Sequence, residues 1–248
     1  MRVSIITVSY NSADTIEETI KSVLSQEGTD IEYIIIDGGS TDKTLQIIES
    51  FKEKINIVVS EPDGGIYDAM NKGISLASGN VIGVLNSDDI YADNQVLKDV
   101  MLQFANSPNL NILYGNLVYV KKDDTEKIVR TWRSESYFDN FFEKGNVPPH
   151  PTLFVSSEVY QRAGSFDLQY NLAADYEFML RVLKKGNFRS KYINRLIVKM
   201  RLGGATNKSF SNILNGNREI LKAWVNNGLI PPLTLMPLRV IKRVSQFF

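Results

Sequence analysis

Four runs rich in β-branched residues alternate with helical patterns in the first part of this chain. The runs cover residues 3–9, 31–36, 55–60 and 81–85, and amphipathic helical patterns cover 15–25, 43–52 and 66–78 between them. Parallel strands need a long crossover connection, and an intervening helix supplies it. The alternation therefore predicts an α/β fold with a mostly parallel central sheet, right-handed crossovers and flanking helices.

Acidic residues stand at the carboxyl ends of these predicted strands, namely Asp37, Asp63, Asp88 and Asp89. Strand ends of a parallel sheet meet at one edge, where ligands of such folds bind. Asp88 and Asp89 follow the buried run 81–85, and burial together with mutual repulsion raises the pKa of neighbouring carboxyls. A hard divalent cation would keep both ionised, because Mg²⁺ is held by one or two carboxylates plus substrate phosphates. Solvated acids in ordinary turns are the alternative explanation.

Composition excludes several classes of protein and site. Lys and Arg together number 28, as do Asp and Glu, so the net charge is zero and no overall positive field favours nucleic acid as a partner. The absence of cysteine excludes disulfides and thiolate metal sites. No run reaches the roughly 18 apolar residues of a membrane-spanning helix, and no signal peptide precedes the first strand. We therefore expect a cytoplasmic protein.

The second half of the chain is less regular. Its patterns predict helices over 95–104, 158–163 and 175–184, a hairpin of strands at 112–120 and 126–130, and a last strand over 193–202. A helix over 209–226 and a basic amphipathic segment over 233–248 follow. Because no internal repeat or low-complexity linker separates these elements, we expect one compact unit with a C-terminal helical appendage.

Five sequence blocks carry a resemblance to a known family. They are Val-Ser-Ile-Ile-Thr-Val-Ser-Tyr-Asn at 3–11, Ile-Ile-Asp-Gly-Gly-Ser-Thr-Asp-Lys-Thr at 35–44, Gly-Ile-Tyr-Asp-Ala-Met-Asn-Lys-Gly-Ile at 65–74, Asn-Ser-Asp-Asp at 86–89 and Ala-Ala-Asp-Tyr-Glu-Phe-Met-Leu-Arg at 173–181. In these blocks, and in their order, the chain resembles the family-2 glycosyltransferases with the GT-A (Rossmann-like) fold. Within that family it looks like bacterial colanic-acid, O-antigen and capsule polysaccharide enzymes.

The resemblance implies an inverting, metal-dependent glycosyltransferase of the hexosyltransferase type. Such an enzyme moves a sugar from a nucleotide diphosphate sugar, with UDP favoured, to a saccharide or lipid-linked acceptor in bacterial surface polysaccharide synthesis at the cell envelope. It also implies a GT-A domain over 1–205, with a nucleotide-binding half at 1–90 and an acceptor half at 91–205, followed by a helical tail at 206–248. The sugar, the acceptor and the linkage are left open.

Four residues are expected to bind the donor nucleotide by resemblance. Asp37 would accept a hydrogen bond from the N3–H of a uracil-like base, which suits a carboxylate because it only accepts. Ser9 and Tyr10 would line the base pocket, and Asp63 would hold the rim of the nucleotide site, where the adjacent glycines permit close backbone approach. The alternatives are a cap on the next helix for Asp37 and a plain turn acid for Asp63.

The acidic pair and the single histidine are expected to serve the metal and the diphosphate. By resemblance, Asp88 faces the ribose or donor sugar and Asp89 binds Mg²⁺ or Mn²⁺. His150, the only histidine, is expected at the metal, the diphosphate or the acceptor, with a filler position on the surface or in the core as the alternative. The family often has arginine where this chain has Met70, and Lys72 is a candidate substitute for that donor contact.

Asp175 matches the catalytic base of inverting members of the family. It would remove the proton from an acceptor hydroxyl while that oxygen attacks the anomeric carbon from the face opposite the leaving group. A single displacement of this kind inverts the anomeric centre and needs one base, unlike the paired carboxylates of glycosidases. The alternative is an ordinary helix N-cap. Glu177, two residues later, is expected to be exposed or to support the site indirectly.

The tail gives a separate hypothesis. Pro231 and Pro232 break the chain, and the segment 233–248 then mixes Arg239, Lys242 and Arg243 with apolar residues. Such a segment can lie in a membrane interface, so peripheral contact at the inner face of the cell membrane is one expectation. Packing against the domain or against a second subunit in a homodimer is the other.

Two other functions are weighed against this interpretation. A nucleotidyltransferase also uses a nucleotide-binding sheet and carboxylate-bound metal, but it is expected to have a glycine-rich, basic triphosphate loop after the first strand. The residues at 9–12, Ser-Tyr-Asn-Ser, are not such a loop. A non-catalytic carbohydrate-binding protein with a glycosyltransferase-like fold is the other possibility, and the intact acids argue against it.

Overall fold

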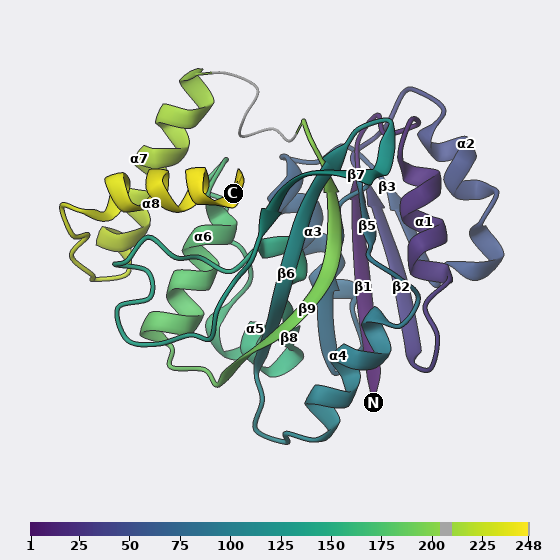
Figure 1. Ribbon diagram of the computed structural model, residues 1–248. Coiled ribbons are helices and arrows are strands. Elements are labelled where there is room, and N and C mark those ends of the chain that lie inside the picture. Colours follow the sequence, from purple (N-terminus) through teal and green to yellow (C-terminus); the bar gives the residue numbers. More distant parts are fainter. Residues whose placement is uncertain (204–209, 248) are drawn as a thin grey trace.

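The computed structural model describes residues 1–203 and 210–247, and it confirms the predicted α/β fold (Figure 1). Within this described part a nine-stranded sheet has the order β3-β2-β1-β4-β8-β6-β9-β5, with β7 paired to β6. The strands are β1 (Arg2–Ser9), β2 (Asp30–Asp37), β3 (Ile57–Ser60), β4 (Val81–Val84), β5 (Asp89–Tyr91), β6 (Ile112–Lys121), β7 (Asp124–Trp132), β8 (Phe154–Ser156) and β9 (Ser190–Arg201).

The first four strands form the parallel part of the sheet. β1 pairs in parallel with β2 and β4, and β2 pairs in parallel with β3. The crossovers between them contain α1 (Ile16–Leu24), α2 (Thr44–Glu49) and α3 (Ile66–Leu76). Residues 3–9 of β1 are all buried, as a central strand covered on both faces requires. The alternation of β-branched runs and helical patterns is thereby confirmed.

The second half extends the same sheet with mixed strand directions. β6 pairs in parallel with β9 and antiparallel with β7 and β8, and β5 pairs antiparallel with β9. The predicted hairpin and last strand are therefore present, whereas the pattern missed β5 and β8. Each of these two strands has three residues, too few for a recognisable alternation. The helices here are α4 (Val96–Ala105), α5 (Ser157–Ala163) and α6 (Ala174–Met179), and a π-helical turn, Leu180–Lys185, continues α6.

The C-terminal appendage consists of α7 (Phe210–Asn226), α8 (Leu235–Val244) and a short 3₁₀ turn (Ser245–Phe247). Ser209 and Phe248, the ends of the two predicted tail segments, lie outside the described residues. In Figure 1 these helices lie beside α6, at the end of the molecule away from α1 and α2. Trp224 is buried and donates from Nε1 to the Tyr176 hydroxyl over 2.9 Å, and Leu235 of α8 is fully buried. The expectation that the tail packs against the domain is therefore confirmed.

Part of the tail stays open to solvent. Val240 and Ile241 of α8 are each 61% exposed, and Leu233 just before it is fully exposed. None of the helices in the described ranges is long and apolar enough to cross a membrane. Peripheral membrane contact, a homodimer and the division at residues 90 and 205 stay predictions.

Candidate active site

Asp37 lies at the carboxyl end of β2 and is fully buried. Its Oδ1 accepts hydrogen bonds from the hydroxyls of Ser9 (3.0 Å) and Ser40 (2.5 Å). Its Oδ2 accepts from the backbone N–H groups of Gly39 (3.1 Å) and Ser40 (2.8 Å) and from the Ser60 hydroxyl (2.9 Å). Five donors from the ends of three strands thus converge on one carboxylate. Asp37 therefore organises the strand-end loops, and its predicted contact with a base stays a prediction.

Asp63 and Tyr10 lie closer to solvent at the same edge. The Asp63 Oδ2 atom is only 2.6 Å from the point where a Cβ on residue 38 would lie, so Gly38 makes room for this carboxylate. Asp63 Oδ1 accepts from the Gly65 N–H over 2.8 Å, which orients the side chain. Asp63 is half-buried, and Tyr10 is 65% exposed. These two side chains, unlike Asp37 and the buried Ser9, can reach a ligand without a rearrangement of the loop.

Asp88 and Asp89 differ sharply in their surroundings. Asp89 begins β5 and is fully buried, and its Oδ1 has no hydrogen-bond partner, while Oδ2 accepts from Asn86 Nδ2 over 3.3 Å. Burial, and after it the negative charge of Asp88, raise the pKa of the Asp89 carboxyl well above its usual range. Asp88 is partly exposed, and its backbone carbonyl accepts from Arg201 Nη1 over 2.9 Å. Only Asp88 of the pair is therefore open to solvent.

The acidic pair fits a divalent cation. A buried carboxylate oxygen without a hydrogen-bond partner is unusual in a folded protein, and a hard cation is one group that can satisfy it. Within residues 1–203 and 210–247, no group of three or more His, Cys, Asp or Glu side chains is arranged to hold a metal. Two carboxylates alone are typical of Mg²⁺ sites that are completed by substrate phosphates and water.

Asp175, the predicted base, is held by two side chains from distant parts of the sequence. Its Oδ1 accepts from the Tyr67 hydroxyl over 3.0 Å, and its Oδ2 lies 3.1 Å from His150 Nδ1. The Asp175 side chain is 22% exposed, and it lines one cavity together with Asn86, from the end of β4. Asp175 therefore faces the edge of the sheet where Asp88 and Asp89 lie.

The alternative that Asp175 is a helix N-cap is wrong. The N-cap position of α6 belongs to Ala173. The carboxylate of Glu219, on α7, instead accepts from the backbone N–H groups of residues 171, 172 and 173 over 3.0, 2.8 and 2.9 Å. This capping from another helix leaves Asp175 free for other contacts.

The structure brings His150 to the predicted base. Its imidazole is 32% exposed and contacts Asp175, so it is neither buried filler nor an isolated surface residue. Sequence reasoning missed Tyr67, although it lies in the block at 65–74, because nothing in the sequence indicated which residue of that block would meet α6. Burial, followed by the negative charge of Asp175, raises the pKa of Tyr67 well above its usual range, so the phenol stays a hydrogen-bond donor.

Lys72 and Glu177 have structural partners. Lys72 Nζ lies 2.9 Å from Glu61 Oε1 and 3.6 Å from Asp68 Oδ2, and these acids raise its pKa. Glu177 is 4% exposed, accepts from Arg181 Nε over 2.9 Å and accepts from Asn227 Nδ2 over 3.0 Å. The expectation that Glu177 could be exposed is wrong, and its indirect support of the site consists of tying α6 to the end of α7.

Comparison with known proteins identifies the family of this chain. The family model described as glycosyl transferase family 2 matches residues 4–163. An uncharacterized glycosyltransferase of Mycobacterium tuberculosis is 35% identical over 182 residues, which are 72% of this chain and 68% of that protein.

Two solved structures are similar in fold. The complex of S. aureus TarS with UDP-GlcNAc has a TM-score of 0.70 at 18% identity, over 99% of this chain and 73% of that chain. A mannosyltransferase from Pyrobaculum calidifontis, in complex with GDP-Man and Mn²⁺, has a TM-score of 0.62 at 18% identity, over 98% of this chain and 74% of that chain. The predicted GT-A fold is thereby confirmed, and this chain belongs to glycosyl transferase family 2.

Proposed function

We propose that this glycosyltransferase is inverting and metal-dependent, and that it transfers a sugar from a nucleotide diphosphate sugar to a hydroxyl of a saccharide or lipid-linked acceptor. The observation that carries the proposal is the contact of Asp175 with both Tyr67 and His150 in a cleft that Asn86 also lines. An oriented carboxylate in one cavity with Asn86, a sequence neighbour of Asp88 and Asp89, supports a shared site of the base and the acidic pair.

Asp175 is the proposed general base. Oδ1 receives a hydrogen bond from Tyr67 and Oδ2 lies 3.1 Å from His150 Nδ1, and each carboxylate oxygen has a second lone pair for the acceptor hydroxyl. As the acceptor oxygen bonds to the anomeric carbon, the bond from that carbon to the diphosphate oxygen breaks and the hydroxyl proton passes to Asp175. Tyr67 and His150 hold the carboxylate in position, so the reacting groups meet in a fixed orientation.

Asp88 and Asp89 are the proposed holders of Mg²⁺ or Mn²⁺, with Asp88 offering the accessible oxygens. When bound, the cation neutralises charge on the departing nucleoside diphosphate. The Mn²⁺ in the Pyrobaculum mannosyltransferase complex supports a divalent cation, although it does not choose between the two metals. Donation from the His150 Nδ1–H to Asp175 Oδ2, 3.1 Å away, is part of the proposal, as is a direct contact of the second ring nitrogen with the diphosphate or the metal.

Asp63 and Tyr10 are the proposed contacts for the nucleotide base, beside the loop that Asp37 and Ser9 organise. The exposure of Tyr10 and the partial exposure of Asp63 support this assignment. UDP is the proposed nucleotide, which the UDP-GlcNAc complex of TarS supports and the GDP-Man complex of the mannosyltransferase does not. Lys72, already paired with Glu61, is the proposed second contact to the donor. The proposed setting is bacterial surface polysaccharide synthesis in the cytoplasm, at or near the membrane.

The decisive experiment is calorimetric titration of UDP, GDP and dTDP with and without Mn²⁺. We expect metal-dependent binding of one nucleotide that is lost in Asp88→Asn and Asp89→Asn. Asp30→Asn is the matched control, because Asp30 is an exposed acid at the opposite end of β2. Binding that persists in both acidic-pair variants would contradict the proposed metal site, and no binding of any nucleotide would favour the non-catalytic carbohydrate-binding protein.

A further inference from the structure

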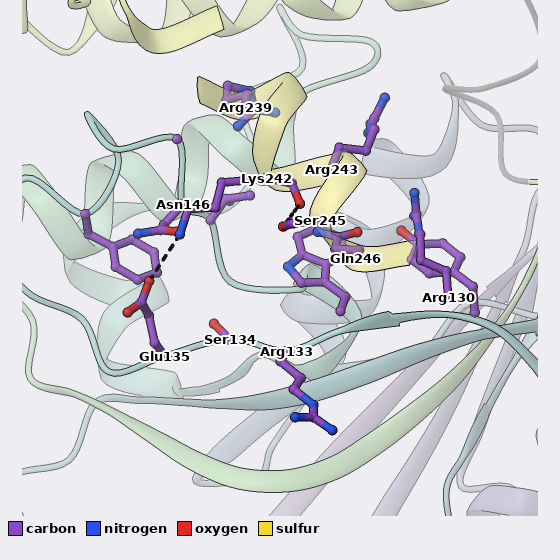
Figure 2. Close-up of a pocket in the computed structure, with 15 residues that line it drawn as sticks. Arg130, Arg133, Ser134, Glu135, Asn146, Arg239, Lys242, Arg243, Ser245 and Gln246 are labelled. Carbon is purple, nitrogen blue, oxygen red and sulfur yellow. Dashed lines mark hydrogen bonds and ion pairs between the residues drawn. The ribbon is translucent and has the colours of Figure 1, made fainter. Parts of the chain in front are cut away.

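A positively charged cavity lies between β7 and α8, outside the acidic edge of the sheet. It has a volume of about 340 Å³. Figure 2 shows Arg239, Lys242 and Arg243 of α8 on one side and the segment from Arg130 to Glu135 on the other. Arg133 belongs to the lining but points away from α8. A protein with zero net charge thus gathers several of its cations around one cavity.

Aromatic rings hold two of the arginines in this cavity. The Arg130 guanidinium lies 3.7 Å from the centre of the Tyr119 ring, and the Arg239 guanidinium lies 4.7 Å from the centre of the Tyr176 ring. The Tyr176 ring positions the Arg239 guanidinium without neutralising its charge. Among the described residues of the lining, Glu135 is the one with a side-chain carboxylate, and it lies 3.7 Å from Lys242.

Three buried donors that line the cavity have no hydrogen-bond partner among residues 1–203 and 210–247. They are Arg239 Nη1, Ser134 Oγ and Asn146 Nδ2, from three separate segments of the chain. Buried polar groups are nearly always paired in folded proteins, so a set of three around one cavity indicates a ligand rich in acceptor oxygens. Burial, and after it the positive charge of Arg243, lower the pKa of Arg239, and a bound anion would oppose that shift.

The cavity adjoins the cleft of the base, because the two share five lining residues. Tyr119, Trp132, Val147, Arg239 and Arg243 line both it and a neighbouring cavity of about 160 Å³. His150 and Asp175 also line that neighbouring cavity. A molecule anchored between β7 and α8 can therefore extend to Asp175, whereas Asp37 and Asp63 of the proposed nucleotide site line neither cavity.

We propose that this cavity binds a phosphate or diphosphate group of the acceptor, and that the group holds the acceptor hydroxyl near Asp175. Phosphate oxygens only accept hydrogen bonds and suit both the planar guanidinium groups and the neutral donors Ser134 and Asn146. The inference rests on the proposed function, because it names the acceptor class of that reaction.

The first test uses inorganic pyrophosphate as the probe, titrated calorimetrically into the full chain in the presence of EDTA. We expect binding that weakens at least tenfold in Arg239→Gln. Two further variants provide the same test if Arg239→Gln does not fold. Arg243→Gln changes an exposed position, and Asn146→Asp adds a negative charge to the cavity. Arg162→Gln is the matched control, because Arg162 pairs with Glu158 on α5. Asp89→Asn should bind pyrophosphate like the unmodified chain.

The outcomes separate this inference from the proposed function. The inference is overturned if the unmodified chain does not bind pyrophosphate. It is also overturned if Asp89→Asn loses pyrophosphate binding while all three cavity variants keep it. Loss of Mn²⁺-dependent UDP binding in the cavity variants also overturns it, because the cavity would then serve the donor. A separate experiment measures binding of the full chain to phosphatidylglycerol vesicles. If the chain binds the vesicles but not pyrophosphate, the arginines and the lysine of the cavity bind lipid headgroups, and the inference is overturned. Absence of nucleotide binding in the unmodified chain contradicts the proposed function and leaves the pyrophosphate result standing.

Discussion

The acidic edge of the sheet and the cationic cavity are built in opposite ways. At the edge, Asp37 receives five hydrogen bonds from groups that lie within 28 residues of it in the chain. In the cavity, Arg239 lies over the ring of Tyr176, and Ser134 and Asn146 come from two other segments. Around Asp37 the edge is thus assembled from short local motifs and is satisfied by the protein itself, whereas Asp89 keeps one open oxygen for a cation. The cavity is assembled from distant segments and leaves donors unpaired.

This difference predicts where substitutions will harm folding and where they will harm chemistry. A group whose hydrogen bonds are all made within the protein mainly stabilises the fold, whereas a group with unfilled capacity is available to a ligand. Asp175 stands between these two regions, since its partners come from α3 and from the segment before β8 while its side chain stays partly open.

The largest effect is expected for Asp175, which lies between the acidic edge and the cationic cavity. Asp175→Asn should lower the turnover of sugar transfer by about 10³-fold, because a positioned base contributes roughly 10²–10⁴. Metal-dependent nucleotide binding should change little, because Asp175 contacts the acceptor. Asp167→Asn, in the turn before α6, is the matched control. Turnover that stays within tenfold of the unmodified enzyme would remove Asp175 from the role of base.

The next effect concerns Asp37, whose carboxylate oxygens are hydrogen-bonded within the protein. Asp37→Asn should destabilise the fold by about 2–4 kcal/mol, since an amide nitrogen would replace one fully occupied, buried acceptor. Urea denaturation measures this change. Asp63→Asn, at the half-buried acid beside it, should leave stability within about 0.5 kcal/mol and weaken nucleotide binding instead. If Asp37→Asn and Asp63→Asn are equally stable, the proposal that Asp37 stabilises the loops while Asp63 contacts the nucleotide is wrong.

A smaller effect tests the connection between the tail and the base. Glu219→Gln should destabilise the protein by about 1–3 kcal/mol, because three backbone N–H groups ahead of α6 lose a charged acceptor. Turnover should fall more than nucleotide affinity, because α6 positions Asp175. Glu158→Gln, on exposed α5, is the control, and a nucleotide affinity that falls as much as turnover would contradict this division.

The smallest expected effect concerns the pH dependence of stability without metal. The folded-state pKa of Asp89 is raised, so the stability it contributes is present below its unfolded pKa of about 3.9 and is lost as pH rises toward the folded value. In EDTA at pH 7–8, Asp89→Asn should therefore melt a few degrees higher than the unmodified chain, since 1 kcal/mol shifts Tm by about 2–4 °C in proteins of this size. Near pH 3.5 the difference should vanish.

Asp93→Asn supplies a control of opposite sign. Arg195 lowers the pKa of Asp93, so the stability from this pair is present above the unfolded pKa and is lost as pH falls. Asp93→Asn should thus melt slightly lower at neutral pH, by a small amount because the pair is partly exposed. If both variants melt at a lower temperature than the unmodified chain at pH 7–8, burial of the Asp89 carboxyl does not destabilise the metal-free fold, and the prediction is wrong.

The sequence predicted the parallel half of the sheet because its signals are local. β-branched runs and helical periodicity fix β1 to β4 and their crossovers, and the acids at their ends follow from the same pattern. β5 and β8 were missed because their three residues each are stabilised by neighbouring strands rather than by their own pattern. Glu219 as a cap for α6 could not be predicted, since no sequence signal connects residues 46–48 positions apart.

The sequence predicted which residues form the candidate site better than it predicted their contacts with one another. The resemblance pointed to Asp37, Asp88, Asp89 and Asp175, but the number of donors around Asp37 and the position of Tyr67 depend on side-chain packing. The approach of His150 to Asp175 depends in the same way on the path of the chain before β8. The cavity between β7 and α8 needs segments more than 100 residues apart, which only the folded chain brings together.

The cap that Glu219 gives to α6 has a consequence for protein synthesis. The ribosome builds the chain from its N-terminus, so the blocks at 3–11 and 86–89 emerge long before residue 219. Nascent chains that end before α7 lack the carboxylate that satisfies residues 171–173, so three backbone amides in the segment leading into α6 lose their acceptor. The donor half can thus be complete on the ribosome while the transfer step waits for α7, so catalytic competence follows the synthesis of Glu219 and not that of the acidic edge.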